Sequence, residues 1–259
     1  MRIAFFGCTA FSERILKTLI DCNQHQVVAI FSIPREFSIS YSKTPVVNTN
    51  YVDLKPYAKK MDLPFYEVNS IKGQRINDYE QKLIELKLDV LLVMGWYYMV
   101  PKNIRSLTKY GAWGIHASLL PDYAGGAPLV WAMIEGATKT GVTLFILSDG
   151  VDDGDIIEQI DFSIEEDETI NEIYEKATLA SQLIIKKVFG NPAYKVKPKQ
   201  QDKAKIKIYP QRSEVDGEIN WDWPVEKIRN FIRAQTKPYP GAWTIINGKK
   251  IILWDATIF

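Results

Sequence analysis

His116 is the residue best suited to acid–base chemistry, because the chain of 259 residues has only two histidines and this one enters an unusual loop. Its surroundings, GIHASLLPDYAGGAP, contain a serine, two prolines and three glycines. A second polar stretch, SDGVDDGDIIEQ, carries four aspartates. An imidazole that faces a carboxylate can accept and return a proton, because the carboxylate sets its tautomer and charge. Taken alone, a single histidine is more often structural and an aspartate cluster more often solvated.

The elements that precede both stretches have the pattern of buried strands. Continuous apolar runs predict strands at residues 2–7, 26–32, 89–95, 111–117 and 141–147. Helical spacing predicts helices between them, at residues 52–61, 76–86, 129–135 and 169–188. This alternation predicts an α/β fold with a mostly parallel, Rossmann-like sheet and helices on both faces. Since parallel strands end at one edge of a sheet, His116 and the aspartates are expected at the same edge.

A predicted loop, linker and turn divide the rest of the chain. The Ser-, Thr- and Pro-rich residues 34–50 predict a long loop. A lysine-rich stretch at residues 191–209 predicts a solvated linker, which separates a main domain at residues 1–190 from a small piece at residues 210–259. Asn247-Gly248 between two β-branched runs predicts a hairpin in that piece. An open hairpin edge can pair across a two-fold axis, which leaves a homodimer open.

The bulk composition excludes several classes of protein. Apolar residues make up 46% and charged residues 24%, as in a globular protein, and the net charge of +1 gives no general attraction to nucleic acid or to a membrane. The opening MRIAFFG is too short for a signal peptide, and no run of about eighteen apolar residues occurs. Cys8 and Cys22 form neither a disulfide framework nor a metal-ligand spacing, so we expect no metal and a reducing cytoplasm.

Common ligand motifs are absent as well. The first predicted turn, GCTAFS, has Gly7 as its only glycine, so it is neither a dinucleotide fingerprint nor a P-loop. No GxSxG elbow occurs. A calcium loop that began at Asp149 would place Val151 and Ile160 where oxygen ligands are needed.

Several motifs, in this order along the chain, resemble the formyltransferase family, which includes methionyl-tRNA formyltransferase and the sugar-nucleotide N-formyltransferases. They are HASLLPDYAGGAPLVW, TGVTL and GVDDGDI, preceded by the opening RIAFFGCTAFSERILKTL and followed by YPQRSEVDGEINWDW and RAQTKPYPGAW. The resemblance covers nearly the whole chain. It implies a formyltransferase catalytic domain at residues 1–190 and a small C-terminal subdomain at residues 210–259.

The resemblance implies transfer of a formyl group from N10-formyltetrahydrofolate, as co-substrate, to an amine. It assigns catalysis to His116 and Asp152. The histidine would accept the proton of the attacking amine, and the aspartate would orient the imidazole. It also implies a set of donor-binding residues, with much of the contact made by the backbone: Tyr98, Met99, Val100, Ser118, Leu119, Leu120, Pro121, Ser148, Asp149, Gly150, Val151 and Asp152.

The sequence departs from the family pattern at two places. Gly114 stands where the family has a catalytic asparagine, and losing one oxyanion donor costs roughly 2.7–4 kcal/mol of transition-state stabilisation. Asp122 and Ala124 stand where relatives often carry basic residues. The first departure leaves two alternatives open, an enzyme and a pseudoenzyme that binds folate or a sugar nucleotide without turnover.

The expected acceptor is the amine of a small molecule, an amino deoxysugar linked to dTDP or UDP, used in surface polysaccharides such as the O-antigen of lipopolysaccharide. A chain with a net charge of +1 is a poor candidate for binding nucleic acid, because tRNA binding needs several cations that contact phosphates. A nucleotide base needs an aromatic surface, and the C-terminal piece contains Trp221, Trp223, Tyr239 and Trp243, although packing is the more common role of such residues. The alternative is methionyl-tRNA as acceptor.

Overall fold

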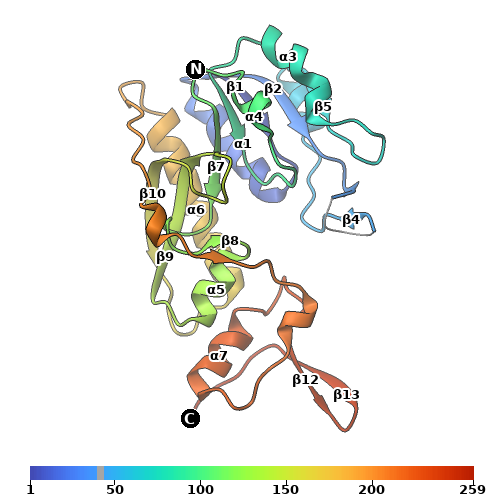
Figure 1. The fold of residues 1–259 in the computed structure, drawn as a ribbon, viewed down its shortest axis with the longest axis vertical. Helices are drawn as coiled ribbons and strands as arrows, with labels where there is room; N and C mark the ends of the chain where they lie inside the picture. Colours follow the sequence, from blue (N-terminus) through green and yellow to red (C-terminus); the bar gives the residue numbers. More distant parts are fainter. Residues whose placement is uncertain (40–43) are drawn as a thin grey trace. The chain divides into compact units, whose positions relative to one another are not determined.

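The computed structural model describes residues 1–39 and 44–259, which form two compact units (Figure 1). The first unit comprises Met1–Ile115, Leu144–Asp149 and Gln182–Pro198, and the second comprises His116–Thr143, Gly150–Ser181 and Lys199–Phe259. Three elements run from one unit into the other: β7 (Ala112–His116), β9 (Lys139–Ile146) and α6 (Ile170–Phe189). The units do not coincide with the segments predicted from the sequence, and that three-part division stays a prediction.

A parallel sheet forms the centre of the first unit. Its strands lie in the order β7, β6 (Val90–Val93), β1 (Arg2–Phe6), β2 (Gln26–Ser32) and β5 (Phe65–Glu67), and all neighbours are parallel. The apolar runs explain these strands, since the last four residues of β1 are buried on both faces. The register places Gly114 of β7 opposite Val93 of β6.

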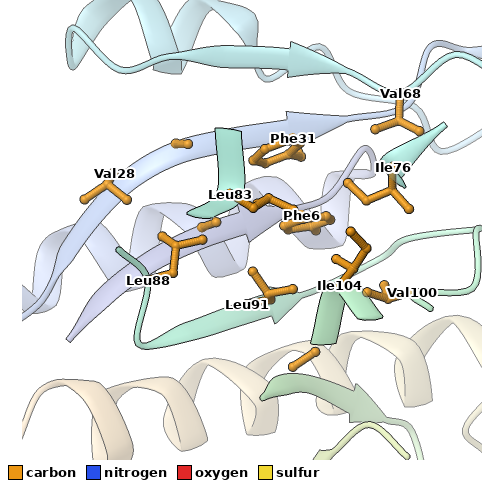
Figure 2. Packing of buried hydrophobic residues seen from close by; sticks show 13 residues of the cluster. Phe6, Val28, Phe31, Val68, Ile76, Leu83, Leu88, Leu91, Val100 and Ile104 are labelled. Carbon is orange, nitrogen blue, oxygen red and sulfur yellow. The ribbon is translucent and has the colours of Figure 1, made fainter. Parts of the chain in front are cut away.

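Aromatic and aliphatic side chains pack on one face of this sheet (Figure 2). The rings of Phe6 and Phe31 stack with centroids 4.6 Å apart. Ile76, Leu83 and Ile104 close the cluster from η1 (Ile76–Tyr79), α3 (Glu80–Glu85) and α4 (Lys102–Arg105). The helix predicted at residues 76–86 is therefore a 3₁₀ turn continued by a short α-helix.

The first turn of the sheet is held by side chains instead of by a glycine-rich loop. Thr9 caps α1 (Ala10–Cys22) in a capping box with Ser12. The Ser12 hydroxyl also donates to the backbone oxygen of Met94, 2.5 Å away, and so joins the ends of β1 and β6. Within the predicted loop at residues 34–50, β3 (Glu36–Phe37) and β4 (Val46–Val47) form a short antiparallel ladder, and residues 40–43 lie outside the described residues. Helix α2 (Lys55–Lys60) follows.

The second unit contains a strand that the sequence did not predict, β10 (Ile156–Ser163), beside β9. The amide of Ile164 donates to Thr138 O at 2.9 Å, and Gly141 lies against Ile160 O, so the two strands run antiparallel. β8 (Ala124–Gly125) pairs in parallel with β11 (Ile208–Tyr209), which brings the end of the predicted linker beside the loop after His116. Helix α5 (Pro128–Ile134) follows β8.

The rest of the second unit ends in the predicted hairpin. Its elements are η2 (Lys203–Lys205), η3 (Glu214–Gly217), α7 (Val225–Arg233), β12 (Ala242–Ile246) and β13 (Lys249–Leu253). Asn247 and Gly248 form the turn with φ of 49° and 71°, the left-handed values such a turn requires. The predicted α/β class, with a mostly parallel sheet and a C-terminal hairpin, is confirmed (Figure 1).

Candidate active site

His116 and Asp152, the two predicted catalytic residues, lie together in the second unit. His116 Nδ1 is 3.4 Å from Asp152 Oδ2, and His116 Nε2 is 2.8 Å from the backbone oxygen of Tyr123. The histidine is 8% exposed. A neutral imidazole can donate to only one of these acceptors, whereas an imidazolium donates to both. These two acceptors match both N–H groups of an imidazolium, the form that His116 takes when it accepts a proton.

The aspartate loop is shaped by its own backbone. Asp152 has a φ of 50°, a left-handed conformation that aspartate tolerates better than most residues. Its Oδ2 accepts a hydrogen bond of 2.8 Å from the Gly125 amide. A Cβ on Gly150 would lie 2.5 Å from the Asp153 carboxylate, so a larger residue here would have to displace that side chain. The loop thus holds the Asp152 carboxylate between the imidazole and a backbone donor.

The SLLP stretch is fixed by buried hydrogen bonds. Thr143 Oγ1 donates to Ser118 O at 2.7 Å and accepts from the Leu120 amide at 3.1 Å. Gln159 Nε2 donates to Leu120 O at 2.9 Å, and the Asp122 amide donates to Leu119 O at 3.0 Å. The Leu120–Pro121 peptide bond is cis. Several peptide groups of residues 118–121, which are expected to contact a ligand, already have hydrogen-bond partners. These bonds hold the stretch in one conformation.

Five of the predicted donor-binding residues belong to the first unit: Tyr98, Met99, Val100, Ser148 and Asp149. Arg105 joins the two segments that carry them. Its Nε donates to Val100 O at 3.0 Å and its Nη1 to Leu147 O at 2.8 Å. Its Nη2 donates to the Asp149 carboxylate, and this bond lowers the pKa of Asp149. The Arg105 side chain is 13% exposed. Sequence reasoning missed Arg105, because nothing in KNIR indicates which oxygens its guanidinium reaches.

Three residues near these loops differ in exposure and partners. Tyr98 Oη lies 2.7 Å from Ser70 Oγ. Met99, in contrast, is 80% exposed, and Val151, in the second unit, is exposed as well. Such exposed apolar side chains are available to a ligand.

Gly114 faces an apolar wall within the first unit. A Cβ added to it would lie 2.9 Å from Leu147 Cδ2 and 3.7 Å from Phe145 Cε1. Its φ lies outside the left-handed region, so the backbone does not require glycine. The space for an asparagine side chain is therefore filled by Leu147, and no oxyanion donor occupies the position.

An aromatic row that sequence reasoning missed follows the His116 loop in the second unit. The Tyr209 ring lies 5.0 Å from the Tyr123 ring and 5.5 Å from the Trp131 ring, centroid to centroid. Lys207 Nζ stands 4.6 Å over Tyr209, and the Arg212 guanidinium stands 4.7 Å over Trp131. Burial, reinforced by the Glu135 carboxylate, raises the pKa of Tyr123. The β8–β11 ladder brings these residues together from separate segments, so the sequence of any one segment does not predict the row.

The four C-terminal aromatic residues named in the sequence analysis contact other protein groups. Trp221 Nε1 donates to Thr244 Oγ1 at 2.9 Å, and Trp243 Nε1 donates to Glu214 O at 2.9 Å. Trp223 packs edge-on against Phe231, and the Tyr239 hydroxyl bonds to that of Tyr174. All four therefore have partners within the second unit.

Two further properties limit the chemistry in the part of the chain that the structure describes. Among these residues, no three His, Cys, Asp or Glu side chains are arranged to hold a metal ion. None of the helices there combines the length and the apolar character needed to span a membrane.

With this geometry in place, comparison with known proteins gives the family. Residues 1–188 match the family described as Formyl transferase. The chain belongs to the formyltransferase family. Residues 212–259 match the family described as Formyl transferase, C-terminal domain. The formyltransferase is thus an enzyme of the transferase class, as predicted.

Proteins similar to the formyltransferase include curated sequences and solved structures. A methionyl-tRNA formyltransferase of Caldanaerobacter subterraneus subsp. tengcongensis is 30% identical over 100% of this chain and 81% of its own length. A solved 4-N formyltransferase from Francisella tularensis has a TM-score of 0.71 at 17% identity, covering 99% of this chain and 98% of its own. An N-formyltransferase from Helicobacter canadensis, solved with folinic acid and dTDP-3-aminofucose, has a TM-score of 0.68 at 20% identity, covering 96% and 86%. At these identities the solved structures show a shared fold.

Proposed function

We propose that this formyltransferase moves a formyl group from N10-formyltetrahydrofolate to the amine of a nucleotide-linked amino deoxysugar. The His116–Asp152 pair carries the proposal. The acceptor amine attacks the formyl carbon and forms the new C–N bond, while its proton passes to His116 Nε2, which gives up its contact with Tyr123 O. The Asp152 carboxylate stabilises the imidazolium that results. The bond from the formyl carbon to N10 then breaks, its electron pair stays on N10, and N10 takes up the proton from His116.

The donor is bound by the predicted residues, grouped as 98–100, 118–121 and 148–152. The rigid SLLP stretch and the Arg105 bonds to Val100 O and Leu147 O support this assignment, because ordered loops bind with less entropic cost. Support for the donor comes also from the Helicobacter canadensis relative, which was solved with folinic acid.

The acceptor is a dTDP- or UDP-linked sugar, and the aromatic row supports this class. Tyr123, Tyr209 and Trp131 provide π faces for a base, and Lys207 and Arg212 provide cations for a diphosphate. We assign the product to surface polysaccharide, such as the O-antigen of lipopolysaccharide. Cys8 and Cys22 are free thiols, which supports the predicted reducing cytoplasm.

Methionyl-tRNA is the second candidate acceptor, favoured by the relative that is 30% identical. The net charge of +1 argues against it, because phosphate contacts dominate the affinity of proteins for nucleic acids.

A panel assay distinguishes the two acceptors. The protein is incubated with N10-formyltetrahydrofolate and either methionyl-tRNA or amino-sugar nucleotides that vary in base and amine position. Mass spectrometry then detects the added formyl group. We expect transfer to one class of sugar nucleotide, abolished by His116→Ala. Transfer to methionyl-tRNA alone would replace the proposed acceptor, and transfer to no acceptor would contradict the proposed function.

A further inference from the structure

Gln201 is a buried residue within the stretch predicted to be a solvated linker. It is 5% exposed, although its neighbour Gln200 is exposed. Its Nε2 donates to Asp152 O at 2.7 Å and to Gly154 O at 2.7 Å. Two carbonyl acceptors fix the orientation of the amide, because only the NH₂ end can donate.

The other end of the same amide has no partner. Gln201 Oε1 is buried without a hydrogen bond among the described residues. An unsatisfied buried acceptor costs roughly 1–3 kcal/mol. An apolar side chain of similar length would avoid this cost, so the value of glutamine here lies in its two donors.

Those donors bind the backbone of the turn that contains Asp152. Asp152 has a left-handed φ of 50°, and its carboxylate must face both His116 Nδ1 and the Gly125 amide. The Gln201 amide bridges carbonyls on both sides of Asp153 and so fixes the turn from which the Asp152 carboxylate projects.

We propose that Gln201 is a positioning residue that holds the Asp152 carboxylate in register with His116. The inference rests on the proposed catalytic roles of His116 and Asp152. It assigns a function to a part of the chain that composition alone marks as a linker.

The test is a double-mutant cycle with a matched control. Gln201→Met keeps the length of the side chain and removes both donors, and Gln200→Met makes the same change at the exposed neighbour. We expect Gln201→Met to lower kcat by about 10–100-fold, because small displacements of a catalytic group are costly, while KM for both substrates changes little. Gln200→Met should leave both unchanged. In an Asp152→Asn background the effect of Gln201→Met should shrink to about twofold or less, since coupled residues are not additive.

Two results of the double-mutant cycle would contradict the role of Gln201. An equal fall in kcat in both backgrounds, or no fall, would overturn the inference, because a merely structural residue acts independently of the Asp152 charge. Gln201→Asn, whose amide is too short to bridge both carbonyls, is the second variant if Gln201→Met does not fold.

A readout independent of turnover separates this inference from the proposed function. The ¹⁵N shifts of the His116 ring should move in Gln201→Met in the same direction as in Asp152→Asn, with His25 as the internal control. Unchanged shifts would overturn the inference even in an active enzyme. An enzyme inactive on the whole acceptor panel would contradict the proposed function, and the His116 shifts would still decide the role of Gln201.

Discussion

The His116 ring is held at both nitrogens, by the Asp152 carboxylate and by the Tyr123 carbonyl. Because both nitrogens face acceptors, Nε2 must release Tyr123 O before it can take the proton of the amine, while the Asp152 carboxylate keeps the ring oriented through Nδ1. The same enclosure limits what His116 contributes to binding, because it leaves only 8% of the residue exposed.

Replacing His116 should therefore remove turnover and spare donor binding. We expect His116→Ala to abolish formyl transfer and Asp152→Asn to lower kcat severely, because each removes part of the proton relay. Donor affinity, measured by calorimetry, should change little in both variants. His25→Ala, at the chain's other histidine, is the control and should keep full kcat. Equal turnover in the wild type and His116→Ala would show that the chemistry does not depend on this site.

Gly114 allows the missing oxyanion donor to be restored. Gly114→Asn alone should gain little, because the new Cβ would meet Leu147 Cδ2 at 2.9 Å. Combining it with Leu147→Ala opens the space, and since one such donor is worth roughly 10²–10³ in kcat, we expect a gain of at least about tenfold over Leu147→Ala. The KM for the donor should stay nearly constant in steady-state assays. No gain in the double variant would mean that another group already stabilises the oxyanion.

At the scale of elements, Arg105 at the end of α4 joins the chain after β6 to the chain after β9. Two of its three bonds go to backbone oxygens, so it fixes the course of both segments. The third bond, to Asp149, keeps that carboxylate ionised at lower pH, because a lowered pKa favours the charged form.

Removing the guanidinium should weaken donor binding more than it slows the chemistry. We expect Arg105→Ala to raise KM for the donor by about tenfold, roughly the value of one hydrogen bond from a charged group, with a smaller change in kcat. Lys102→Ala is the matched control, because Lys102 Nζ also faces Asp149, at 3.7 Å, from a side chain that is 78% exposed. If kcat fell while KM stayed constant, Arg105 would not be acting through the donor.

Elements determined by local signals could be predicted from the sequence, and those determined by distant contacts could not. Asn247-Gly248 encodes its own turn, and the buried runs encode the parallel strands. In contrast, β10 was missed because IIEQIDFS continues directly from the aspartate loop and only its pairing with β9 reveals a strand. His116 and Asp152 could be predicted to lie close together because motifs carry both, and the structure places them 3.4 Å apart. Gln201 and Arg105 act on backbone oxygens far along the chain, and nothing in their own segments indicates those partners.

At the scale of the whole molecule, donor binding should appear as added stability. Folate that binds only the folded chain stabilises it by about 2.7 kcal/mol at a hundredfold excess over Kd. We expect 5-formyltetrahydrofolate to raise Tm by several degrees in a thermal-shift titration, equally in the wild type and His116→Ala. p-Aminobenzoylglutamate, which lacks the pterin, is the control ligand. A constant Tm at saturating 5-formyltetrahydrofolate would exclude both transfer from folate and folate binding without turnover.

The second half of α6 has a consequence for how the protein is made. The five parallel strands β1, β2, β5, β6 and β7 have been synthesised by His116, yet Gln182 bonds to Arg14 and Thr18, and the Phe189 ring lies 5.9 Å from the ring of Trp113. A ribosome that adds about 5–20 residues per second therefore leaves Arg14, Thr18 and the Trp113 ring without these partners for several seconds. A nascent chain in that interval is a natural client for a chaperone, and a gene truncated before α6 should yield aggregates instead of a smaller folded protein.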